Sequence, residues 1–280
     1  MRRLVVDTDL MVWISRYDTE SPRSSSAMLY SQFQDLHRQR VSDGAIVPVF
    51  SGVTKRVLVL VWSQLGDFDS VEYAIWLQRE AEWLSKQDLD IRAIAIGNVE
   101  SGKKFCDYTG FPESQLFLDP TAELHRELGL YPGLRIKVPG VSETGNAWVN
   151  LFLMCAGIGS PGTLKEVFRG YLGDRSAPQL IAADEVVQAT PLPALKGSFF
   201  DLAGGNGFQR PFELATVRLK NMSEVLSHWK TYVPDARYMT QRGGTFVFDV
   251  DRTLVYEHRD RGILGFAKNM SRPLSFLEQV

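Results

Sequence analysis

The chain has 280 residues, of which 44% are hydrophobic and 23% charged, and its formal net charge is −2. This length exceeds the roughly 100–150 residues of a typical domain and fits one domain that carries a large insertion. The balanced charge offers no basic surface for nucleic acid. No apolar run approaches the roughly 20 residues that a membrane-spanning helix needs. Asp7 and Asp9 make the N-terminus a poor signal-peptide core, so we expect a cytoplasmic protein, from a cytosol or a plastid stroma.

The sequence contains two cysteines, Cys106 and Cys155. Two cysteines cannot supply a disulfide framework for a chain of this size, and such a count is typical of a reducing compartment. A bridge between them is the less favoured alternative. Cys155 follows the apolar run Leu151–Met154 and is expected to be an inert core residue.

Two units are expected along the chain: an N-terminal extension over residues 1–44 and an α/β domain over residues 45–280. In chain order we predict a loop over 18–26, a helix over Ser26–Arg40, strands over Ala45–Phe50 and Arg56–Trp62, a helix over Ser70–Lys86, a strand over Ile91–Ile96, a helix over Ser101–Tyr108, a strand over Leu116–Leu118 and a helix over Thr121–Leu128. Strands and helices that alternate with short connections indicate parallel pairing with right-handed crossovers. The run Arg56–Trp62 is apolar throughout, as in a strand buried on both faces.

An insertion over about 131–205 interrupts this rhythm with many glycines and prolines. It contains two predicted helices, Ala147–Gly157 and Thr163–Leu172. The stretch Asn146–Ile158 is apolar almost all round and is expected to bury most of its surface, either in the insertion's own core or against a partner or membrane. After the insertion we predict an edge strand over Phe212–Leu219, a short helix over Ser223–Lys230 and a hairpin of Thr245–Phe248 with Leu254–His258.

The loop Ser63–Ser70 is the strongest candidate site, because it carries the chain from a buried strand to the start of a helix. Unpaired N–H groups and the helix dipole make such a position attractive to anions. The loop offers Asp67, Asp69 and Ser70 as binding residues. The simpler interpretation is that the aspartates cap the helix, with Asp69 at the cap and Glu72 completing a capping box.

Several segments occur in an order that resembles the AhpC/TSA superfamily, and within it the peroxiredoxin-like branch found in cyanobacteria and plastids. They are the loop Ser63–Ser70, Gly110-Phe111-Pro112, Leu118-Asp119-Pro120, Leu128-Gly129-Leu130, the run 243–249 and Tyr256-Glu257-His258-Arg259. The resemblance covers about 45–130 and 205–270. It implies a thioredoxin-like fold with a central mixed sheet flanked by helices, an N-terminal extension and a helical insertion, and a thiol redox or antioxidant role.

The same resemblance exposes a departure in the loop. Peroxiredoxins carry a Pro-x-x-x-Thr/Ser-x-x-Cys motif there, and the related branch often shows Gly-Cys-x-x-Cys. This chain has Gly66-Asp67-Phe68-Asp69-Ser70, which places Asp67 and Ser70 at the two cysteine positions. A carboxylate cannot be oxidised and regenerated as a sulfenic acid can, so the ordinary peroxidase reaction is not expected at this loop.

Two residues outside the loop are further candidates. Cys106 follows Lys103 and Lys104, whose charge can lower a thiol pKa, so it is the candidate catalytic residue. The alternative is a half-buried structural cysteine. Arg242 stands where peroxiredoxins often place an arginine that orients the substrate, which implies a contact with the Asp67 loop; the alternative is a surface arginine beside a turn.

No cofactor or metal is expected. The four histidines show no ligand spacing, and Gly204–Gly207 lacks the lysine and helix context of a phosphate loop. Three functions remain open: a peroxiredoxin-like oxidoreductase using Cys106 or a partner's thiol reductant, a non-catalytic binding module for a protein or small ligand, and a peripheral membrane protein that docks through the insertion.

Overall fold

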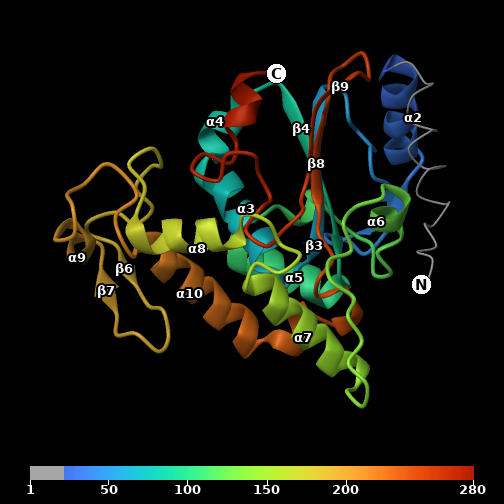
Figure 1. Cartoon of the computed structure of the whole chain (residues 1–280). Helices are drawn as coiled ribbons and strands as arrows, with labels where there is room; N and C mark the ends of the chain where they lie inside the picture. The colour runs from blue at the N-terminus through green and yellow to red at the C-terminus, as the bar shows by residue number, and fades with distance from the viewer. Residues whose placement is uncertain (1–21) are drawn as a thin grey trace, which may run out of the picture.

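The structure, a computed structural model, describes residues 22–280, with side chains from residue 26 on. The prediction for the N-terminal segment up to residue 21, including its aspartates, lies outside the described residues. Seven strands form one mixed sheet in the order β2-β1-β5-β4-β3-β8-β9 (Figure 1). Their bounds are β1 His37–Arg40, β2 Ile46–Pro48, β3 Arg56–Gln64, β4 Leu89–Ile96, β5 Leu116–Leu118, β8 Gly244–Phe248 and β9 Leu254–Arg259.

The pairing within this sheet is thioredoxin-like. Strands β3, β4 and β5 are parallel, β8 is antiparallel to β3, and β9 forms a hairpin with β8. A β3-α3-β4 unit with a hairpin added beside β3 is the thioredoxin arrangement, here extended by β5, β1 and β2 at the other edge. The predicted α/β fold class is confirmed.

Helices cover both faces of the sheet (Figure 1). Their bounds are α2 Pro22–Gln34, α3 Phe68–Arg79, α4 Ala81–Ser85, α5 Val99–Thr109, α6 Glu123–Glu127, α7 Glu143–Cys155, α8 Thr163–Leu172, α9 Ser198–Asp201, α10 Glu213–Ser227 and α11 Trp229–Tyr232. Short 3₁₀ turns occur at Glu113–Gln115, Ala236–Tyr238 and Ser275–Glu278. No helix in the described part of the chain is long and apolar enough to cross a membrane.

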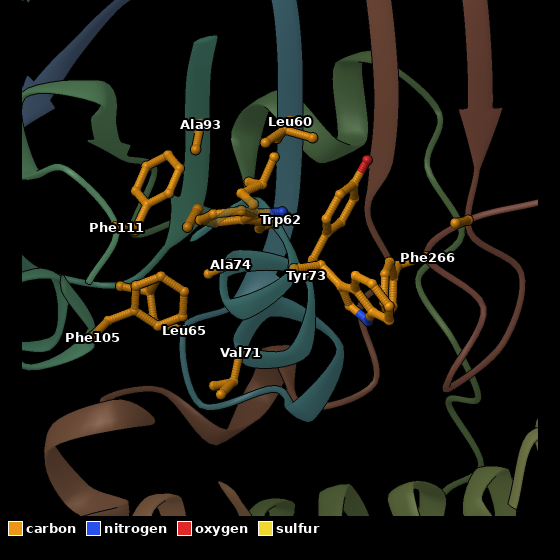
Figure 2. Close-up of a cluster of buried hydrophobic side chains, with 14 of the residues drawn as sticks. Leu60, Trp62, Leu65, Val71, Tyr73, Ala74, Ala93, Phe105, Phe111 and Phe266 are labelled. Atoms are coloured by element: carbon orange, nitrogen blue, oxygen red, sulfur yellow. The ribbon is translucent and has the colours of Figure 1, made fainter. Parts of the chain in front are cut away.

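Strand β3 organises two hydrophobic cores, one on each face of the sheet. Its alternate residues Leu58, Leu60 and Trp62 face the larger core beneath α3 and α5, and the intervening valines face the smaller core beneath α2 and α6. Figure 2 shows the larger core, where Trp62 packs against Phe105 and Phe111 with ring centroids 5.4 and 4.9 Å apart. The continuous apolar run in the sequence is therefore explained by burial on both sides.

The N-terminal prediction is wrong in two respects. Helix α2 begins at Pro22, where a loop was expected, and ends at Gln34. Residues His37–Arg40, expected to continue the helix, instead form β1, which pairs with β5 and β2 inside the main sheet. All four residues of β1 are polar and three of them are half-buried. No alternation of apolar residues therefore marked them as a strand.

The segment after the insertion is also helical where a strand was expected. Phe212–Leu219 does not form an edge strand: α10 runs from Glu213 to Ser227 and packs on α3 and α8. Helix α3 ends at Arg79, and α4 follows after Glu80, so the single helix expected to reach Lys86 is divided.

The insertion packs as helices α7 and α8 beside α10, with α9 and the small sheet β6 Val186–Val187 and β7 Leu195–Lys196 farther out (Figure 1). Of the two alternatives for the apolar helix, burial of most of its surface in the insertion's own core is not seen, and contact with a partner or membrane stays a prediction. Only Asn150 and Met154 of α7 are fully buried, and Phe152 is 64% exposed.

Candidate functional site

The site begins where β3 passes into α3. Asp67 is the N-cap of α3: its backbone is extended, and its Oδ1 accepts a hydrogen bond of 3.0 Å from the Asp69 N–H. Gly66 before it lies against α11, and a Cβ at that position would come within 2.4 Å of Val233 Cγ2. The turn therefore needs glycine for close packing.

Asp69 does not cap the helix, contrary to the sequence prediction. Its side chain turns inward, and both carboxylate oxygens lie 2.8 Å from the backbone N–H of Leu264, which donates to them. Leu264 has a positive φ of 57°, a conformation that costs energy for a residue with a branched side chain. The Asp69 carboxylate thus helps to hold the segment after β9 against the start of α3.

Arg242 lies between the two aspartates and is 1% exposed. It forms an ion pair with Asp67, and its Nη1 lies 3.4 Å from Asp69 Oδ2. Its Nε donates to the Thr240 carbonyl at 3.2 Å. Burial lowers the pKa of the Arg242 guanidinium, but the charges of Asp67 and Asp69 outweigh burial and leave this pKa raised. Arg242 is therefore a buried cation whose partners come from the protein itself.

A third carboxylate, Asp260, completes the cluster. Its Oδ2 accepts from the Gly243 N–H at 3.2 Å, and its Oδ1 lies 3.5 Å from His258 Nε2. Burial, followed by the charge of Asp69, raises the pKa of Asp260 well above its usual value. Burial and the Asp67 charge raise the pKa of Asp69 to about 7. Both shifts favour the protonated form of these two carboxyl groups, which offsets the excess of carboxylates over the single guanidinium of the cluster.

Ser70 lies one turn into α3 and is buried. Its Oγ is 3.1 Å from Ser63 Oγ, at the end of β3. The hydroxyl therefore ties the helix to the strand and does not face open space. The structure thus brings Asp67, Asp69 and Arg242 into contact, with Ser70 directly behind them.

Cys106 lies apart from this cluster. It is 5% exposed within the larger core, and burial, with a further contribution from Glu113, raises the pKa of its thiol to about 12. Lys104 is already engaged in an ion pair with Glu224, with its Nζ 2.9 Å from Glu224 Oε1. The effect expected from the neighbouring lysines is therefore not seen, although the role of Cys106 itself stays a prediction.

Cys155, which the sequence predicted to be an inert core residue, lies beside Asp67 instead. It is exposed and not a core residue, and it lies at the C-terminal end of α7. It lines a small cavity of about 40 Å³ together with Gln64, Asp67 and Phe68. Although the residue as a whole is exposed, its thiol is partly enclosed by this cavity, and that partial burial together with the negative charge of Asp67 raises the pKa of the thiol. Neither cysteine is in a disulfide.

The space beside Asp67 is small, but a much larger cavity adjoins it. A volume of about 40 Å³ holds only a few water molecules. The neighbouring cavity has about 930 Å³ and shares Phe68, Cys155 and Ile263 with the small one. It runs between α8, α10 and the segment 192–203. Its walls come from the insertion and from α10, the helix predicted as a strand, so sequence reasoning could not assemble it.

The cluster has the residues for proton storage and for holding its own loop closed. It offers no nucleophile other than the neighbouring Cys155 thiol. Within residues 22–280 there is no group of three or more histidine, cysteine or carboxylate side chains placed to hold a metal ion.

Comparison with known proteins gives a family and a distant structural similarity. No curated protein sequence matches the chain. A solved thioredoxin-like protein from Aeropyrum pernix is similar at 15% identity and a TM-score of 0.29, over 40% of this chain and 80% of that chain. This similarity is too low to bear on the site.

The family model described as AhpC/TSA antioxidant enzyme matches residues 76–262. This range is more than half of the chain and contains Arg242, Asp260 and both cysteines, while the loop with Asp67 and Asp69 lies just before it. The chain belongs to the AhpC/TSA antioxidant enzyme family.

Proposed function

We propose that this protein keeps the thioredoxin-like scaffold of its family but acts as a binding protein, without peroxide reduction at the loop that starts α3. The observation that carries the proposal is the closed cluster of Arg242 with Asp67 and Asp69. The resemblance in sequence implies that this loop is where relatives hold their cysteine and that Arg242 corresponds to their substrate-orienting arginine. Here the arginine is neutralised by aspartates from that same loop.

Two physical facts support the loss of peroxidase chemistry at this place. A substrate would have to displace a buried ion pair, and breaking such a pair leaves uncompensated charge in a site of low polarity. The free volume beside Asp67, about 40 Å³, has room for hydrogen peroxide but not for an alkyl hydroperoxide, so the volume argues only against the larger substrate. Because Arg242 is already paired with Asp67 and Asp69, its positive charge does not attract an anion from solution.

Peroxide consumption with dithiothreitol as reductant tests this proposal. We expect the wild-type protein to consume hydrogen peroxide or an alkyl hydroperoxide no faster than dithiothreitol alone. Cys106→Ser and Cys155→Ser should behave as the wild type does. A protein-dependent rate that either substitution abolishes would overturn the proposal.

A second candidate function is thiol redox chemistry at Cys155, and the exposure of this thiol beside the Asp67 loop favours it. In this reaction the Cys155 thiolate attacks the terminal oxygen of a hydroperoxide, the O–O bond breaks, and the alkoxide that leaves takes up the proton that the thiol released, which gives a sulfenic acid and an alcohol. Because Cys106 is buried in the core, a separate thiol reductant must reduce the sulfenic acid and release water. The raised pKa of Cys155 weighs against it, since the thiolate is the nucleophile. The Cys155→Ser variant in the same assay decides between the two.

A further inference from the structure

We propose that the cavity between α8, α10 and the segment 192–203 is a binding site for a neutral, apolar small molecule such as a long-chain alcohol. This inference rests on the proposed function and supplies its ligand class. The cavity has a volume of about 930 Å³, close to the upper end of the roughly 300–1,000 Å³ typical of ligand pockets.

The shape of the cavity follows the two helices that form its walls. On α8 the lining extends from Thr163 to Tyr171, and on α10 from Ala215 to Met222. At 1.5 Å per residue these stretches are about 10–12 Å long. With a volume of about 930 Å³, the cavity is roughly as wide as these stretches are long, so it has room for a compact apolar molecule or a bent alkyl chain.

The lining is largely apolar, and the hydroxyl groups of its two threonines are already satisfied within the protein. Thr163 Oγ1 donates to the Ile263 carbonyl at 2.8 Å, and Thr216 Oγ1 donates to the Phe212 carbonyl at 2.9 Å. Neither hydroxyl proton is free for a ligand.

The one charged group in the lining, Arg218, is also satisfied. Its Nε and Nη2 donate to the two carboxylate oxygens of Glu72 at 2.7 and 3.0 Å, and its Nη1 donates to the Glu166 carbonyl at 3.0 Å. The guanidinium is therefore held in a bidentate pair and is not available to a ligand carboxylate. Burying an ionised headgroup here would leave it unpaired, so the site favours a neutral ligand.

The cavity is open at one end and meets the closed cluster at the other. Phe199, Leu202 and Phe212 line it and are themselves more than half exposed, so apolar side chains mark its outer part. At the other side Phe68 and Cys155 are shared with the small cavity beside Asp67. A ligand that fills the cavity therefore covers the Cys155 thiol. A concave site of this volume fits a small molecule better than the flat surface of a protein partner.

Fluorescence titration with the neutral probe N-phenyl-1-naphthylamine, followed by displacement at pH 8, tests the site. We expect 1-dodecanol to displace the probe at a concentration about tenfold or more below that needed with dodecanoate, because only the carboxylate must be desolvated. Maleimide labelling of Cys155, located by peptide mass mapping, should slow about fivefold or more in the presence of 1-dodecanol, since the thiol is then covered.

Two tryptophan substitutions on α10 provide the matched pair. Ala215→Trp fills the cavity and should weaken probe binding about tenfold or more. Leu226→Trp adds the same side chain at an exposed position outside the lining and should leave probe binding unchanged. Circular dichroism checks the fold of each variant, and if Ala215→Trp does not fold, Met222→Trp takes its place.

Three results would overturn the inference. The first is no probe binding by the folded wild-type protein, and the second is equal displacement by the alcohol and the carboxylate. The third is that the wild-type protein forms a dimer in analytical ultracentrifugation and that Ala215→Trp dissociates it. A second copy of the chain, and not a small molecule, would then cover the cavity. The outcome of the peroxide assay does not depend on these three results. A wrong ligand class can therefore be told apart from a wrong proposed function.

Discussion

At the scale of single residues, Arg242 balances a cluster of three carboxyl groups, those of the buried Asp69 and Asp260 and of the half-buried Asp67. Replacing it with methionine keeps the side-chain volume but leaves Asp67 and Asp69 without their cation. Removal of one partner from a buried pair typically costs about 3–5 kcal/mol. We expect Arg242→Met to lower the free energy of unfolding by about this amount, measured by urea denaturation.

The control for this prediction is Arg237→Met, which removes an exposed arginine paired with Asp235 and should cause no measurable change. A second variant separates charge from packing. Asp69→Asn combined with Arg242→Met should recover part of the lost stability, because one buried negative charge is removed together with its partner. A loss for Arg242→Met as small as that of Arg237→Met would show that the cluster is solvated.

Asp69 gives the protein a stability that depends on pH. Its pKa is raised to about 7 in the folded state, by burial first and then by the charge of Asp67, against an ordinary value of 3.8. Between these two values the folded state binds more protons than the unfolded state, so this group's contribution to stability falls as the pH rises from about 4 to about 7. Asp69→Asn should flatten that part of the profile, measured by the free energy of unfolding at several pH values.

The exposed Asp184→Asn is the comparison for that experiment, and it should keep the wild-type slope. A wild-type slope retained in Asp69→Asn would assign the effect to another group. Asp260, His258 and Asp67 face the same space, and Asp260 is the first to examine, since its pKa is also raised.

The sequence led to the residues of the site but not to all of their roles. Asp67, Asp69 and Arg242 were singled out from a loop position and a resemblance. Asp67 caps α3 in place of Asp69, because the Asp69 carboxylate accepts instead from the backbone N–H of Leu264. Leu264 is 195 residues away from Asp69 along the chain. The exposure of Cys155 could not be predicted either, because the apolar composition of α7 indicates burial whether or not a neighbour covers each residue.

At the scale of elements, a buried arginine holds the outer wall of the large cavity together. Arg210 is 0% exposed and pairs with Glu213 at 2.7 Å and with Asp201 of α9. It also donates to the carbonyls of Ile181, at 2.7 Å, and Gly197, at 3.1 Å. One side chain thus joins residue 181, the segment 197–201 and the start of α10.

Arg210→Met should loosen this wall before it unfolds the rest of the protein. We expect chymotrypsin to cleave faster within residues 199–202, where aromatic and leucine side chains are exposed, and we expect probe binding to weaken with the loss of the wall. Lys196→Met, a change at an exposed residue of the same region, is the control and should be cleaved as the wild type is. Unchanged cleavage in Arg210→Met would mean that apolar packing alone holds the segment.

Elements with strong local signals were predicted well, and those set by tertiary contacts were not. The apolar run of β3 and the glycine after α5 marked their elements directly, and α8 was predicted with the bounds that it has. Strand β1 carries four polar residues and becomes a strand only because β5 and β2 pair with it. Helix α10 contains Thr216 and Val217, which favour strands, yet α3 and α8 bury it as a helix.

At the scale of the whole molecule, the two cores should make the sheet the most persistent part of the structure. Strands β3 and β8 are buried along nearly their whole length and paired on both sides, whereas the small sheet of the insertion has two residues in each strand. We expect amides of β3 and β8 to show the slowest hydrogen exchange and those of 178–207 to exchange faster by orders of magnitude. Mass spectrometry of labelled peptides checks this, with and without 1-dodecanol.

Bound ligand should slow exchange in α8 and α10 while leaving β3 unchanged, because the ligand contacts only the former. Equal protection of the insertion and the sheet without ligand would show that the chain opens as one cooperative unit.

The contacts of the cluster also fix when it can form as the chain is made. Asp67 and Asp69 leave the ribosome early, but Arg242 follows 173 residues after Asp69 and Leu264 follows 195 residues after it. Contacts of such separation carry a large loop-closure cost and form late in folding. Before these contacts form, both carboxylates stay hydrated. The β3-α3-β4 unit then has no arginine paired with the aspartates at the start of α3. A nascent chain that stops short of Arg242 lacks strands β8 and β9 as well as the cation of the cluster, so the last forty residues complete the sheet and the site together.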